Sequence, residues 1–126
     1  MIINLTQHLA TAEQRAAGVV DLPEPLRLEL AGLLTFDKCP TWQEVEERSH
    51  AMALLAQRAN GQPERAMIGG APWMMAQLTY ALADRDILPL FSFSRPESVE
   101  AVQPDGSVRK ASVFRHVGFV GDEVAE

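Results

Sequence analysis

The sequence is poor in cysteine and in long apolar runs, and each shortage excludes a class of protein. A single cysteine, Cys39, excludes an internal disulfide, and with no Cys or His cluster beside it we interpret it as a spectator thiol rather than a nucleophile. No apolar run approaches the roughly 18–20 residues that span a bilayer. No basic segment precedes the first apolar residues, so we expect no secretory signal. These absences favour a cytoplasmic protein that does not enter a membrane.

Basic side chains are also scarce, with 11 Lys and Arg against 17 Asp and Glu and a formal net charge of −6. An acidic chain is a poor partner for duplex nucleic acid, whose binding rewards basic surfaces. The charge is uneven, because residues 91 to 121 carry four basic and three acidic side chains. A small anionic ligand near this segment is therefore compatible with the acidic total, although the ordinary charge of a solvated hairpin is the simpler explanation.

Signatures of metal binding and of nucleophilic catalysis are missing. The histidines His8, His50 and His116 are scattered, with no spacing that gathers metal ligands, so we expect no metal and no cofactor. No G-x-S-x-G nucleophile elbow, GxGxxG fingerprint or Walker loop occurs. No repeat or linker divides the 126 residues, which predicts a single domain over residues 1–126.

Strands alternate with helices along the chain. We expect strands over 1–6, 19–22, 65–70 and 87–94, the last buried on both faces, and helices over 11–18, 24–34, 41–59 and 71–86. The spacing of Thr11 and Gln14 predicts a capping box at the start of the first helix. In the helix over 41–59, one face is expected to be small or apolar, formed by Val45, Met52, Ala56 and Ala59. This alternation predicts an α/β fold, a Rossmann-like three-layer sandwich with a mainly parallel sheet. Asp105-Gly106 lies between two further β-rich runs, which predicts a C-terminal β-hairpin.

Small polar residues follow three of the expected strands. In an open parallel sheet, ligands bind beyond the carboxyl ends of the strands. These ends, at 5–8, 69–73 and 91–98, bring to one edge Thr6, Gln7, His8, Gly69, Gly70, Trp73, Ser92, Ser94 and Arg95. The two glycines and the start of the helix after them suit the binding of a phosphate. Arg95 can add a charge-assisted hydrogen bond, and Trp73 or Phe93 offers a ring for stacking on a base.

Each of these features has a simpler explanation when taken alone. The glycine pair fits a tight turn from strand to helix, Trp73 fits a packing role, and His8 fits a hydrogen bond before a helix. Arg115 and His116 fit an exposed pair on the last strand. The convergence of polar residues at three strand ends, rather than any single motif, favours a binding site.

Three segments together resemble the small CRISPR-associated ring-nuclease-like proteins, whose Rossmann-like domain is akin to the cyclic-oligoadenylate sensor domains called CARF. The segments are INLTQH with the capped helix after it, MIGGAPW leading into a helix, and LPLFSFSRPESVE followed by DGSVRKASVFRHVGF. They come from both ends and the middle of the chain, and the resemblance is poor over about 22–60. The resemblance implies a homodimer that binds a cyclic oligoadenylate in a two-fold symmetric pocket at the strand ends. It also implies metal-independent cleavage, in which a ribose 2′-OH attacks the neighbouring phosphate and a defence response is switched off.

The same resemblance implies roles for individual residues. His8 or His116 is the candidate general acid or base, and Arg95 contacts phosphate or ribose together with Ser92 and Ser94. The pocket is further lined by Thr6, Gln7, Gly69 and Gly70. No lysine lies in these loops. This keeps open a non-enzymatic module, phage-borne or bacterial, that sequesters a nucleotide or binds a protein, and also a pocket for an unrelated metabolite.

Overall fold

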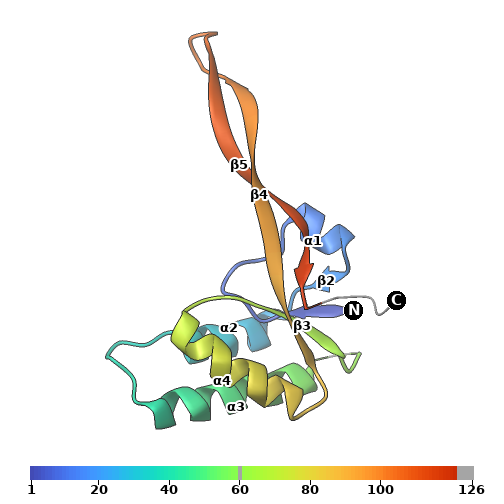
Figure 1. The fold of residues 1–126 in the computed structure, drawn as a ribbon, viewed down its shortest axis with the longest axis vertical. Coiled ribbons are helices and arrows are strands. Elements are labelled where there is room, and N and C mark those ends of the chain that lie inside the picture. Colours follow the sequence, from blue (N-terminus) through green and yellow to red (C-terminus); the bar gives the residue numbers. More distant parts are fainter. Residues whose placement is uncertain (60, 122–126) are drawn as a thin grey trace.

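The computed structural model of the chain describes residues 1–59 and 61–121. A five-stranded sheet with the strand order β2-β1-β3-β4-β5 organises these residues (Figure 1). The strands are β1 (Ile2–Asn4), β2 (Val19–Val20), β3 (Arg65–Ile68), β4 (Leu88–Val102) and β5 (Val108–Val120). The first four are parallel and β5 is antiparallel to β4. The predicted α/β fold, with a mainly parallel sheet and a C-terminal hairpin, is confirmed.

Three helices cover one face of the sheet and enclose most of the core. They are α2 (Glu24–Leu34), α3 (Trp42–Arg58) and α4 (Pro72–Ala83). Thr41 caps α3, because its hydroxyl accepts the N–H of Glu44 at 3.1 Å. The apolar face expected for α3 is confirmed, since Val45, Met52 and Ala56 are all buried. Because α4 begins four residues after the end of β3, its N-terminus lies beside the carboxyl end of that strand.

The opposite face has a thinner cover. The helix α1 (Ala12–Ala16) has no buried residue, yet it contacts both β2 and β5, the strands at the two edges of the sheet. A small apolar cluster lies on this side and consists of Ile2, Ala10, Val19, Met67 and Leu90, with Phe119 packed against it. Hydrogen bonds, rather than apolar packing, therefore hold α1 across the sheet.

β4 continues far beyond the sheet. It pairs with β3 only from Leu88 to Phe91, while its pairing with β5 runs on to Val102, so the two strands form a ribbon that projects from the body (Figure 1). The prediction that this strand is buried on both faces is wrong: Leu88 and Phe93 are 45% and 50% exposed. Phe93 is exposed despite the apolar character of this segment because β4 leaves the body of the protein after four residues of parallel pairing with β3.

The tip of the ribbon is the predicted Asp105-Gly106 turn. Gly106 has φ +84°, a backbone conformation that glycine adopts without strain, and Asp105 accepts the N–H of Ser107 at 2.9 Å. The expected hairpin is thus confirmed. Among the described helices, none combines the length and apolar character needed to cross a membrane.

Candidate functional site

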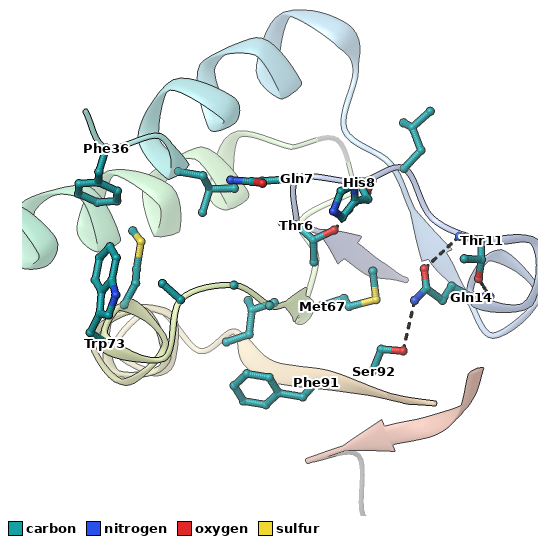
Figure 2. Close-up of a pocket in the computed structure, with 17 residues that line it drawn as sticks. Thr6, Gln7, His8, Thr11, Gln14, Phe36, Met67, Trp73, Phe91 and Ser92 are labelled. Atoms are coloured by element: carbon teal, nitrogen blue, oxygen red, sulfur yellow. Dashed lines mark hydrogen bonds between the residues drawn. The ribbon is translucent and has the colours of Figure 1, made fainter. Parts of the chain in front are cut away.

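A hollow of about 840 Å³ opens at the carboxyl ends of β1 and β3 and beside β4 (Figure 2). Its wall combines the loop after β1, the start of α1, the chain just after α2, the turn from β3 into α4, and the point where β4 passes the end of β3. Of the predicted site residues, the hollow brings together Thr6, Gln7, His8, Gly69, Gly70, Trp73 and Ser92.

The remaining predicted residues lie elsewhere, because β4 does not end where expected. Ser94 and Arg95 belong to the projecting ribbon and do not line the hollow, so the prediction of a strand end at 91–98 is wrong. Ser92 lines the hollow because it is the first residue of β4 beyond the last pair with β3, between Phe91 and Ile68. His116 lies on β5 and reaches the hollow only through Ser92.

The loop that carries residues 6–8 is held by one buried amide. Asn4 is 4% exposed, and its Nδ2 donates to the carbonyl oxygen of His8 at 2.7 Å and to Asp21 Oδ1 at 2.8 Å. Its Oδ1 accepts the backbone N–H of Thr6 at 2.9 Å and the Thr6 hydroxyl at 2.7 Å. A buried amide with donors and acceptors satisfied fixes the conformation of the segment bonded to it. The Thr6-Gln7-His8 wall is therefore preorganised.

Asp21 anchors the far side of this loop. One of its oxygens also accepts the Ala10 N–H at 3.0 Å, and the other faces the Arg15 guanidinium at 3.2 Å. Burial acts to raise the pKa of Asp21, but the hydrogen bonds from Asn4, Ala10 and Arg15 together outweigh it and hold that pKa below its ordinary value. The ionised carboxylate is the form that the fold stabilises.

A chain of hydrogen bonds leads from α1 past the hollow to β5. The Thr11 N–H donates to Gln14 Oε1 at 3.0 Å, and Gln14 Nε2 donates to Ser92 Oγ at 3.2 Å (Figure 2). Ser92 Oγ in turn lies 2.7 Å from His116 Nδ1. The Thr11–Gln14 part is the capping box expected from the sequence.

The direction of this chain determines where the protons lie. A backbone N–H only donates, so Gln14 Oε1 accepts and Nε2 faces Ser92 as the donor. The Ser92 oxygen accepts that bond, and among the described residues His116 Nδ1 is the acceptor within reach of its hydrogen. We therefore assign the Ser92 hydrogen to His116 Nδ1, an assignment that places the proton of neutral His116 on Nε2. Because Ser92 lines the hollow, its hydroxyl connects a bound ligand to an imidazole that can accept a proton.

The other end of the hollow is aromatic. The rings of Phe36 and Trp73 meet edge to face, with centroids 5.1 Å apart, at the end opposite the Gln14–Ser92 pair (Figure 2). The Arg48 guanidinium lies 4.0 Å from the centroid of the Phe36 ring. Arg48 is itself held by the carbonyl oxygens of Gly32 and Leu33 in the last turn of α2, and of Thr35 directly after it. The hollow thus has one polar end and one apolar, flat-walled end.

Between the two ends lies the turn from β3 into α4. Gly70 has φ +144°, which disfavours any side chain, whereas its added Cβ would meet only Met75 at an ordinary 3.7 Å. The backbone conformation, not crowding, therefore requires glycine here. Ala71 gives α4 no side-chain cap, so the positive end of the helix dipole faces the hollow uncapped.

Positive side-chain charge is scarce around the hollow. Its wall, taken over the described residues, contains no Lys and no Arg, and His8 is the one lining side chain that can become cationic. Across the same described ranges, no three His, Cys, Asp or Glu side chains gather closely enough to hold a metal ion. Any phosphate bound here relies on backbone N–H groups, hydroxyls, amides and His8.

Sequence reasoning missed four supporting residues. Asn4 and Asp21 are polar residues that adjoin apolar strands, and this placement is a signal for a buried hydrogen bond. Gln14 was identified as a capping residue, but its second bond joins positions 78 residues apart. Phe36 lies in the segment with little family resemblance, and nothing in its local pattern points to the hollow.

In comparison with known proteins, the model of the family described as the uncharacterized protein MJ1673 family matches residues 1–120. No curated protein and no solved structure matches the chain. The matched span contains every residue that lines the hollow and both strands of the ribbon. The description of the family names neither a ligand nor a reaction.

Replacing Asp21 with Asn should remove a pH-dependent part of the stability. The lowered pKa of Asp21 means that its contribution is complete above the ordinary Asp pKa of about 3.9 and is lost as the pH falls through the folded-state pKa. We expect Asp21→Asn to lower the unfolding free energy by about 1–3 kcal/mol near neutral pH. The difference from the unmodified protein should shrink below about pH 4. Denaturant titrations at a series of pH values measure both quantities.

The control is Glu46→Gln, which removes a charge from an exposed position on α3. A deficit of Asp21→Asn that stays constant from neutral to acid pH would contradict the assignment of the ionised carboxylate to the loop anchor.

Replacing Gln14 with Glu should reverse the direction of the hydrogen bond between Ser92 and His116, so that His116 becomes the donor. Glutamate preserves the capping box, since it can accept the Thr11 N–H, but it cannot donate to Ser92. The Ser92 hydroxyl should then donate to the introduced carboxylate and accept a hydrogen bond from His116 Nδ1. In this arrangement neutral His116 carries its proton on Nδ1. Nitrogen-15 NMR of the His116 ring distinguishes the two arrangements. An unprotonated Nδ1 in both proteins would show that Gln14 does not set the tautomer.

Proposed function

The chain belongs to the MJ1673 family of uncharacterized proteins, and we propose that it binds a cyclic oligoadenylate in this hollow and cleaves it without a metal ion. One observation carries the proposal. At one edge of the parallel sheet, the uncapped N-terminus of α4, which follows two glycines, lies at the same hollow as His8, and His116 is connected to that hollow through Ser92. In the cytoplasm, such a reaction would switch off an antiviral response that the cyclic nucleotide signals.

The proposed step is an internal phosphoryl transfer. The ribose 2′-oxygen forms a bond to the adjacent phosphorus, the bond from phosphorus to the 5′-oxygen breaks, and the ring opens to a linear product with a 2′,3′-cyclic phosphate. A base takes the proton of the 2′-OH, and an acid returns a proton to the 5′-oxygen. The backbone at Gly69-Gly70 and the start of α4 suit the charge that develops on the phosphate.

Two imidazoles are available for the proton transfers. His8 lines the hollow directly, and its loop is held by Asn4. His116 is connected to the hollow through the hydrogen bond between its Nδ1 and the Ser92 hydroxyl. This arrangement supports one histidine acting at the ligand and the other acting through Ser92.

One observation favours a second function, sequestration of the nucleotide without cleavage. The described wall of the hollow has no Lys or Arg to stabilise a phosphorane-like charge. Phosphoryl transfer depends largely on such electrostatic stabilisation, whereas binding can rely on neutral donors.

A homodimer is part of the proposal, and the ribbon supplies the surface that supports it. Val102 and Phe114 are each 75% exposed on the ribbon. A two-stranded ribbon is marginally stable alone in water, so a second copy that covers it would stabilise it. Stable interfaces take roughly 20–30 residues from each partner, which is about the length from Ser94 to His116. Because the ribbon leaves the sheet beside the hollow, a partner there would also approach the ligand.

Incubation with labelled cyclic tetra- and hexa-adenylate, with a chelator present, tests the activity. We expect linear products, and we expect His8→Ala and His116→Ala each to slow cleavage at least about 100-fold, the usual contribution of an acid or base. The matched control is His50→Ala, an imidazole on α3 that contacts Arg85 outside the hollow. A tight complex with intact ligand would support sequestration instead, and the absence of binding would contradict both functions.

Sedimentation velocity tests the dimer. We expect Phe114→Ser to weaken dimerisation at least about tenfold, since truncating a central aromatic residue of an interface has effects of this size. Tyr80→Ser is the matched control, because Tyr80 is 71% exposed on α4 and lies away from the ribbon. A monomer at every concentration of the unmodified protein would contradict the dimer.

A further inference from the structure

We infer that the aromatic end of the hollow is a subsite for a nucleobase, with Trp73 as the stacking platform. This inference rests on the proposed function in one respect, namely that the ligand is a nucleotide. It concerns the part of the hollow that is farthest from the Gln14–Ser92 pair (Figure 2).

Phe36 is a fixed wall rather than a mobile side chain. Its ring is contacted by the Arg48 guanidinium at 4.0 Å and by the Trp73 ring in an edge-to-face arrangement with an interplanar angle of 79°. Arg48 also pairs with Glu44 at 3.0 Å, in addition to its bonds to the C-terminal end of α2 and to Thr35. Because these contacts occupy Phe36, its ring orients Trp73 and is not itself the free surface.

Trp73 keeps part of its ring accessible while it lines the hollow. The edge-to-face contact with Phe36 does not bury the indole, since Trp73 is 40% exposed. Trp42 is also exposed but lies outside the hollow, so it is the position of Trp73 in the wall, together with its exposure, that points to a ligand. The accessible part of the Trp73 ring is the flat surface that we assign to stacking on a planar ring.

The position of Trp73 in the chain places such a ring beside the expected phosphate. Trp73 follows Gly70 by three residues and is the second residue of α4, so its ring and the uncapped helix N-terminus belong to the same turn. One turn can thus contact the base and the phosphate of the same nucleotide. Phe36 and Trp73 form this end of the hollow, and apolar side chains such as Leu34 and Met74 also line the hollow. We infer that the subsite recognises a flat ring by stacking rather than one base by hydrogen bonds.

Titration of the full chain carrying Trp42→Phe, in which Trp73 is the remaining tryptophan, tests the subsite. The ligands are adenosine monophosphate and ribose 5-phosphate, which differ by the base. We expect the monophosphate to change the Trp73 emission saturably and to bind at least about fivefold more tightly than ribose 5-phosphate, the lower end of the range for stacking one base.

Variants at two tryptophans complete the test, with affinities measured by calorimetry. Trp73→Leu should weaken adenosine monophosphate binding at least about fivefold and leave ribose 5-phosphate binding unchanged, while Trp73→Phe retains most of the affinity. Trp42→Leu is the matched control, because Trp42 is 67% exposed at the start of α3 and does not line the hollow. Thermal melts establish that each variant is folded.

Equal affinities for the two ligands, or unchanged affinity in folded Trp73→Leu, would overturn the subsite. Trp73-dependent binding of the monophosphate without binding of cyclic oligoadenylates would uphold the subsite and contradict the proposed function. Binding and cleavage of cyclic oligoadenylates that do not depend on Trp73 would uphold the proposed function and overturn the subsite.

Discussion

The change of partner along β4 is the constraint on which the rest of the structure depends. β4 pairs with β3 as far as Phe91, and from that residue on it is paired with β5. Because β1 and β3 end at this level while β4 continues, the sheet has a step at its carboxyl edge, and the hollow lies in that step. The irregular register between Phe93 and Ser94 falls just beyond it, where a bulge allows the ribbon to bend away from the sheet. The same strand therefore forms a wall of the hollow and the base of the ribbon.

Separate supports hold the two ends of the hollow. At the polar end, Asn4 and Asp21 fix the loop after β1, and Gln14 joins the start of α1 to Ser92. At the aromatic end, Arg48 holds Phe36 against Trp73. Each support is a buried or half-buried hydrogen bond or ring contact between segments far apart in sequence. A site held in this way binds without large rearrangement, because its side chains are already ordered.

Much of the site followed from local patterns. The glycine pair before a proline-opened helix, and the polar residues after the first strand, were expected at one edge because parallel strands end together. Ser92 was correctly expected there, but Ser94 and Arg95 were not, since the end of a strand depends on its neighbours rather than on its own residues. Phe36 reaches the hollow because α2 packs against α3 and the Phe36 ring contacts Arg48 and Trp73, and no local pattern encodes such contacts.

By itself, the sequence determined the alternation of strands and helices, the capping box at α1, the apolar face of α3 and the Asp105-Gly106 turn. These features depend on residues a few positions apart, and backbone geometry alone makes them readable. Only the tertiary structure decided how far β4 extends, which ring nitrogen of His116 meets Ser92, and which ring contacts Trp73. Those outcomes depend on hydrogen bonds and contacts between distant segments, which exist only after the sheet has assembled.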